Sequence, residues 1–127
     1  MIVKHVSDIA GTDNEVDTRT WDSRRMLVRS DGLGFSLNHT VIKAGTETPI
    51  WYKNHVEAVY CIDGEGEIEV EGDRTYPIRP GTLYVLNGHE KHLLRAKSAM
   101  TMLCVFDPPL TGKEVHDAEG AYPLAEA

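Results

Sequence analysis

The chain has 127 residues, of which 41% are hydrophobic and 26% charged, proportions that suit one globular domain and exclude a disordered chain. Its 20 acidic residues outnumber its 13 basic ones, giving a net charge of −7, so nucleic acid and anionic membranes are poor partners. The apolar runs also fall far short of the ~20 residues that a membrane-spanning helix needs.

Glycine and proline separate short runs rich in Val, Ile, Tyr and Thr, a pattern typical of an all-β domain. In chain order, the pattern predicts strands near residues 1–6, 25–30, 34–43, 47–52, 56–62, 66–71, 73–78, 82–87, 91–97 and 100–106. It also predicts a short helix around residues 17–25. Many short antiparallel strands with at most one or two short helices indicate a sandwich or barrel, which protects strand edges.

Side chains alternate along two of these strands, so that each strand has two distinct faces. The first strand has Ser36, Asn38 and Thr40 on one face. The second has His55, Glu57, Val59 and Cys61 on one face. Leu37, His39 and Val41 share the opposite face of the first strand.

Cys61 and Cys104 each lie within an apolar, strand-like run. Two such cysteines are typical of reduced core residues in a cytosolic protein, and the pattern favours this interpretation over a disulfide or a metal–thiolate site. The first residues also lack the basic stretch and apolar core of a signal peptide. We expect a cytoplasmic protein.

The end of the chain differs from the strands before it. Pro108 and Pro109 stop the last predicted strand, and the segment from Gly112 to His116 is mostly polar. We expect residues 1–127 to form one domain, in which residues 107–127 fold back over or beside the mouth of the barrel.

Residues 45–64 have the spacing of the first motif of the metal-binding cupins. That motif is a glycine, five residues, a His-x-His pair, three or four residues, a glutamate, six residues and a glycine. Gly45, Glu57 and Gly64 stand at the expected places. Trp51 and Lys53 occupy the places of the two histidines.

Residues 81–92 have the spacing of the second cupin motif: glycine, five residues, proline, one residue, glycine, two residues and histidine. Gly81 and His92 match, whereas Asn87 and His89 replace the proline and the inner glycine. Two motifs of matching length predict a cupin fold, a double-stranded β-helix or jelly-roll barrel, with Glu57 and His92 pointing inward.

A carboxylate and an imidazole alone make a poor metal site, and Tyr84, on the strand before His92, offers a third ligand. Glu57, Tyr84 and His92 supply two hard oxygens and one nitrogen, a set that suits iron or manganese better than thiolate-preferring metals. Zinc also accepts oxygen and nitrogen ligands and competes well with Fe²⁺. The residues alone leave the choice of metal open.

Several segments together carry a more specific likeness that covers nearly the whole chain. They are residues 31–36 (DGLGFS), 44–48 (AGTET), 54–61 (NHVEAVYC), 64–67 (GEGE), 77–81 (PIRPG), Tyr84, 92–97 (HLLRAK) and, most specifically, 104–116 (CVFDPPLTGKEVH). In these segments the chain resembles the ectoine synthases, a family of cupin cyclases in compatible-solute biosynthesis.

The resemblance implies an iron-dependent, cytosolic homodimer that serves the response to osmotic stress. Zinc and manganese are the substitute metals that the chemistry of the three ligands allows. Such an enzyme is a hydro-lyase that closes N4-acetyl-L-2,4-diaminobutyrate into ectoine with loss of water. The metal ligands of the family match Glu57, Tyr84 and His92, the three that the spacing suggests. Its substrate-site residues match Trp21, Arg25, Asn38, Thr40, Tyr52, His55, Phe106, Glu114 and His116.

Two positions depart from some members of that family, which have histidine where Pro49 and Trp51 stand here. Neither change touches the three predicted ligands. Both bear on the shape and polarity of the barrel mouth.

The reaction itself assigns roles to these side chains. Arg25 would hold the substrate carboxylate in a fork that lysine cannot copy, and Glu114 would hold the ammonium. Tyr52 and His55 are the candidates for moving protons during ring closure. Trp21 and Phe106 would wall the pocket and exclude water, because the reverse reaction is a hydrolysis.

Two other functions stay open at this point. One is a metal-dependent cupin enzyme with another small substrate, such as a dioxygenase, although that class prefers two histidines and one carboxylate. The other is a non-catalytic cupin, which would bind its ligand tightly without turnover.

Overall fold

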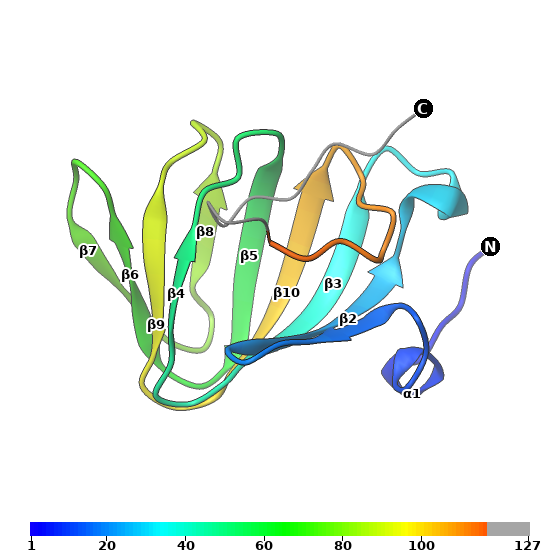
Figure 1. Cartoon of the computed structure of the whole chain (residues 1–127), viewed down its shortest axis with the longest axis horizontal. Helices are drawn as coiled ribbons and strands as arrows, with labels where there is room; N and C mark the ends of the chain where they lie inside the picture. The colour runs from blue at the N-terminus through cyan, green and yellow to red at the C-terminus, as the bar shows by residue number, and fades with distance from the viewer. Residues whose placement is uncertain (117–127) are drawn as a thin grey trace.

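Two antiparallel β-sheets make up the part of the chain that the computed structural model describes, residues 1–116 (Figure 1). The larger sheet has the order β1 (Glu15–Asp17), β2 (Trp21–Leu27), β3 (Ser36–Ile42), β10 (Met100–Asp107), β5 (Val56–Asp63) and β8 (Leu83–Leu86). The smaller has the order β4 (Glu47–Ile50), β9 (His92–Ala96), β6 (Gly66–Val70) and β7 (Thr75–Ile78). The predicted all-β class is confirmed.

Alternation of side chains explains how the larger sheet encloses the core. Every second residue of β3 is buried, beginning at Ser36, and β10 alternates in the same way from Met100. Because these inward faces mix apolar and polar side chains, the core is apolar around Met102 and Phe106 but carries polar groups within it, among them Asn38.

Two predicted elements near the N-terminus are wrong. The helix expected around residues 17–25 is instead the end of β1, a turn and the first five residues of β2, where Trp21, Ser23 and Arg25 are buried at a period of two. The strand expected at residues 1–6 is replaced by coil and the short helix α1 (Val6–Ile9), whose first turn is capped by His5. With the 3₁₀ helix at Arg29–Asp31, the short helices number two in the described residues, as expected.

The glycine at the end of the first motif is required by its surroundings. Gly64 has a φ of 85°, in the left-handed region that glycine tolerates best. A Cβ there would also lie 2.0 Å from the carbonyl oxygen of Ala99. The turn after β5 therefore has no room for a side chain at position 64, and only glycine fits there.

After β10, residues 108–116, which we call the C-terminal strap, cross in front of β3 and β10 in orange in Figure 1. Leu110 anchors the strap: its side chain is fully buried, its N–H donates to Ser36 Oγ at 2.9 Å, and its carbonyl accepts from Arg29 N at 2.7 Å. The rest of the predicted fold-back, residues 117–127, lies outside the described residues.

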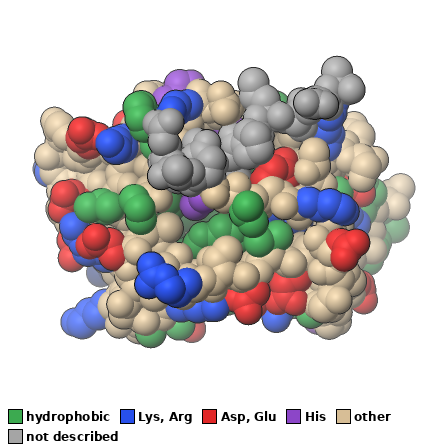
Figure 2. Space-filling model, viewed as in Figure 1, with side chains coloured by type: hydrophobic (Ala, Val, Ile, Leu, Met, Phe, Trp, Pro, Cys, Tyr) green, Lys and Arg blue, Asp and Glu red, His purple; other side chains and the backbone are tan. Residues whose placement is uncertain are grey.

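Cys61 and Cys104 are free and buried, so the sequence-based interpretation of them as core thiols is confirmed. Within residues 1–116 no helix has the length and apolarity needed to cross a membrane. Charged side chains surround smaller apolar patches on the face shown in Figure 2.

Candidate functional site

A cavity between the two sheets gathers most of the predicted site residues. It is lined by Trp21, Asn38, Thr40, Ile42, Thr48, Ile50, Tyr52, Glu57, Val59, Tyr84, Leu94, Met102, Cys104, Phe106 and His116. The remaining predicted residues, which are buried but absent from this lining, are Arg25, His55, His92 and Glu114.

Neighbouring strands β5 and β8 bring Glu57 and Tyr84 to the same cavity. Glu57 is 5% exposed, and burial raises the pKa of its carboxyl from 4.5 to about 8, although a hydrogen bond from the thiol of Cys104 lowers it. Burial also raises the pKa of Tyr84 well above its ordinary value, and the neighbouring Glu57 charge adds to this. Each group therefore resists ionisation in the protein alone.

His92 begins strand β9 and is 3% exposed. Its Nδ1 lies 3.0 Å from the carbonyl oxygen of Glu90, which selects the tautomer that donates from Nδ1 and leaves the lone pair on Nε2. Nε2 is buried and has no hydrogen-bond partner among the described residues. Burial lowers the pKa of His92, so its imidazole is neutral at pH 7, as a metal ligand must be.

These three side chains fit a cation. A buried carboxyl with a raised pKa, a buried phenol and a buried imidazole lone pair without a hydrogen-bond partner among the described residues are groups that a nearby positive charge would stabilise in their ligating forms. Within residues 1–116 no cluster of three His, Cys, Asp or Glu side chains could hold a metal ion. The predicted set reaches three ligands through Tyr84.

Arg25 is fully buried at the centre of β2 and held from three sides. Its Nε donates to Ser23 Oγ at 2.9 Å, and its Nη2 donates to the carbonyl oxygen of Glu114 at 2.8 Å. The guanidinium also lies 5.7 Å from the ring centre of Trp21, a cation–π distance. The strap and the larger sheet thus meet at this side chain.

Aromatic rings surround Tyr52 at the end of the cavity nearest the strap. Its hydroxyl lies 2.8 Å from Nε2 of His116, and its ring meets Phe106 edge-on at 5.2 Å. The ring of His55 lies 6.0 Å from Phe106 and is 1% exposed. Burial lowers the pKa of His55, although the Glu114 and Asp107 charges raise it.

The carboxylate of Glu114 is engaged within its own turn. It accepts hydrogen bonds from the N–H groups of Thr111, Gly112 and Lys113 and from the Thr111 hydroxyl. Burial alone would raise the pKa of Glu114, but these bonds lower it below the ordinary value. Glu114 therefore shapes the strap, and its role in holding an ammonium stays a prediction.

Two departures from the cupin motifs, Trp51 and His89, contact each other. Trp51 Nε1 donates to the His89 carbonyl oxygen at 3.0 Å, and His89 Nδ1 lies 2.9 Å from the carbonyl oxygen of Tyr52. His89 has a φ of 55°, the left-handed conformation that explains why the motif has glycine there. These contacts join the loop before His92 to the loop that carries Tyr52.

Sequence reasoning missed two polar residues of this region. Cys104 lines the cavity and hydrogen bonds to Glu57, and Ser23 lies between Arg25 and Thr40. Their strand phase was the available signal, because Cys104 is two residues before Phe106 and Ser23 two residues before Arg25.

Comparison with known proteins gives one consistent family. The model of the ectoine synthase family matches residues 1–126. A curated L-ectoine synthase from Desulfatibacillum aliphaticivorans is 57% identical over 129 residues, covering 99% of each chain. The crystal structure of an ectoine synthase from P. lautus is 67% identical with a TM-score of 0.90, covering 100% of this chain and 93% of that one.

A more distant match shows the fold alone. A cupin-2 domain from Rhodospirillum rubrum is 22% identical with a TM-score of 0.62, covering 70% of this chain and 60% of that one. The predicted cupin fold is therefore confirmed.

Proposed function

This chain belongs to the ectoine synthase family, and on that premise we propose that it closes N4-acetyl-L-2,4-diaminobutyrate into ectoine with loss of water. It is accordingly a hydro-lyase of compatible-solute biosynthesis that serves osmotic stress. The observation that carries the proposal is the shared cavity, where Glu57 and Tyr84 meet Tyr52 and the aromatic walls. The cavity joins ligand-type side chains to side chains that can enclose a small substrate.

The proposed metal is Fe²⁺, held by Glu57, Tyr84 and His92, with zinc or manganese as substitutes. The buried Nε2 of His92 and the raised pKa of Glu57 support this assignment. Lewis-acid polarisation of the amide carbonyl of the substrate is the chemistry that such a metal supplies when bound.

Arg25 provides the binding site for the substrate carboxylate in this proposal. Its guanidinium is buried beside Trp21, and a planar fork of donors can hold both oxygens of a carboxylate. Fixing the carboxylate folds the flexible substrate so that its amine approaches the amide carbon. Proximity of this kind contributes up to about 7–11 kcal/mol in ideal cases.

His55 and Tyr52 move protons in the proposed reaction. Burial lowers the pKa of His55, so the imidazole is neutral at pH 7 and can take a proton from the substrate ammonium, which must become an amine to attack. The Tyr52 hydroxyl, 2.8 Å from His116, can pass a proton toward the leaving oxygen. Trp21 and Phe106, 5% and 1% exposed, keep bulk water from the ring-forming atoms.

We also propose a cytoplasmic homodimer in which the chain forms one domain and the C-terminal strap closes its mouth. An apolar outer surface on β5 and β8 supports the dimer: Tyr60, Ile62, Leu83 and Val85 are all exposed, and β8 ends the larger sheet of the described strands. The free cysteines suit a reducing compartment. Light scattering of the purified protein, expected to give twice the mass of one chain, tests the dimer.

The test of function is an NMR assay of the purified, iron-loaded protein with N4-acetyl-L-2,4-diaminobutyrate, with chelated protein as the matched control. We expect ectoine to form only with metal. Tight binding without turnover would instead identify a binding cupin, and oxygen consumption with a substrate would identify a dioxygenase. Arg25→Lys is expected to raise KM about tenfold or more, because lysine loses the bidentate contact.

A further inference from the structure

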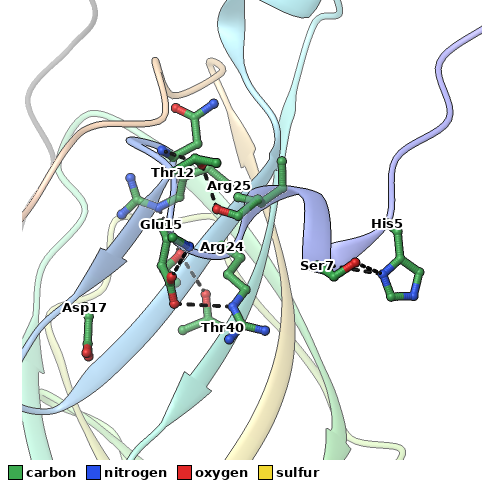
Figure 3. A network of polar contacts seen from close by, with 12 residues as sticks. His5, Ser7, Thr12, Glu15, Asp17, Arg24, Arg25 and Thr40 are labelled. Atoms are coloured by element: carbon green, nitrogen blue, oxygen red, sulfur yellow. Dashed lines mark hydrogen bonds and ion pairs between the residues drawn. The ribbon is translucent and has the colours of Figure 1, made fainter.

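Ser23 lies two residues before Arg25 on β2, so both side chains point to the same inward face of the larger sheet. Ser23 is 1% exposed and Arg25 is fully buried. Arg24, the residue between them, points to the other face of the sheet and pairs with Glu15 (Figure 3). The strand thus separates a surface arginine from an interior one.

The Ser23 hydroxyl is a junction between two strands. It accepts from Arg25 Nε at 2.9 Å and from Thr40 Oγ1 at 3.0 Å, and the sheet register places Thr40 directly opposite Ser23. Figure 3 shows Thr40 on the strand beside the one that carries Arg25. Two lone pairs on a hydroxyl oxygen can accept both bonds together.

The same line of polar side chains continues across the sheet. Thr40 lies near the thiol of Cys104, and that thiol donates a hydrogen bond to Glu57. Thr40, Cys104 and Glu57 line one cavity, so polar side chains extend from β2 across β3 and β10 to β5. Ser23 is the link nearest Arg25.

The hydrogen bond from Arg25 to Ser23 affects the orientation of the Arg25 guanidinium because that group is planar. The five N–H donors of a guanidinium lie in one plane, so a fixed Nε and a fixed Nη2 determine where the remaining donors point. Ser23 Oγ holds Nε and the Glu114 carbonyl holds Nη2. Loss of the Ser23 contact removes the hydrogen bond that fixes Nε, and the plane then depends on the remaining contacts, among them the Glu114 carbonyl and the Trp21 ring.

We propose that Ser23 is a positioning residue, whose hydroxyl sets the plane of the Arg25 guanidinium for the carboxylate of the substrate. This inference rests on the proposed function, because it requires Arg25 to bind that carboxylate. Ser23 is not among the residues that line the cavity, and in this proposal its hydroxyl acts through Arg25.

The test compares iron-loaded wild type with Ser23→Ala and Ser23→Thr in the NMR cyclisation assay. Ser23→Ala is expected to raise KM about tenfold and to change kcat by less than about threefold, since a lost bond to a charged group changes an equilibrium about tenfold or more. Ser23→Thr keeps the hydroxyl and is expected to restore KM. If Ser23→Ala does not fold, Ser23→Cys carries the same expectation, because sulfur accepts weakly at a similar volume.

Thermal unfolding of Ser36→Ala, which loses an equally buried hydroxyl on β3, calibrates the stability cost of such a loss. Three results would each overturn the inference. They are a wild-type KM in Ser23→Ala, a loss of kcat in Ser23→Ala as large as its rise in KM, and a raised KM that Ser23→Thr does not restore. Absence of turnover in the wild type would instead refute the proposed function, so the two failures are distinct.

Discussion

Glu57 is expected to make the metal-free protein less stable as the pH rises, and Glu57→Gln is expected to abolish this dependence. Burial raises the pKa of the folded carboxyl from 4.5 to about 8. Between these values the folded protein holds a proton that the unfolded chain has released, so the free energy of unfolding falls with rising pH. The contribution is complete below pH 4.5 and lost above about pH 8.

The size of the effect follows from the two pKa values. At about 1.36 kcal/mol for each pH unit between them, the loss reaches at most about 5 kcal/mol above pH 8. A domain of this size has roughly 5–15 kcal/mol of stability in total, so the change is large enough to measure. Glutamine at position 57 stays neutral and keeps nearly the same shape, and it therefore escapes the loss.

The measurement is urea unfolding of chelated wild type and Glu57→Gln at intervals from pH 5 to pH 8.5. Other titrating groups are common to both proteins, so the difference between the two curves isolates residue 57. The variant is expected to gain on the wild type progressively toward high pH. Parallel curves would show that the Glu57 carboxyl is ionised and solvated in the folded protein, and the reasoning from burial would be refuted.

Three further changes test other parts of the site. His92→Ala is expected to abolish bound iron, measured by metal analysis, together with cyclisation; full activity in a metal-free variant would contradict the role of His92. His55→Ala is expected to lower kcat by about 10²–10⁴-fold while the iron content stays unchanged, and a normal rate would exclude proton transfer by His55. Leu110→Ala, which removes the buried anchor of the strap, is expected to cost about 2–5 kcal/mol of unfolding free energy in urea, and an unchanged midpoint would show that the strap is not anchored there.

Local pattern was enough for elements whose side chains alternate clearly. Residues 34–43 and 100–106 were predicted as strands, and β3 (Ser36–Ile42) and β10 (Met100–Asp107) form there. The side chains of β3 alternate in polarity, and residues 100–106 are rich in apolar residues between turn signals. Residues 17–25 misled the same reasoning, since their inward face includes Ser23 and Arg25, which resemble surface residues in a sequence. In this segment, the burial of polar residues hid the two-residue period of the strand.

Motif spacing selected Glu57 and His92, with Tyr84 from the strand between the motifs, and the cavity holds Glu57 and Tyr84 together. The spacing of the motifs could not predict the protonation states of these side chains. The pKa of Glu57 depends on its burial by the barrel and on Cys104 from another strand. The free Nε2 of His92 depends on the carbonyl of Glu90.

The amino-acid sequence by itself therefore determined the all-β class, the family and the set of side chains available for chemistry. Motif spacing and the alternation of side chains can both be read along the chain without knowledge of its fold. Only the tertiary structure decided how those side chains are held. Arg25 is fixed by Ser23, two residues away, and by the carbonyl of Glu114, 89 residues away. Contacts between distant segments, and the desolvation they produce, arise when the barrel closes and leave no local signature in the chain.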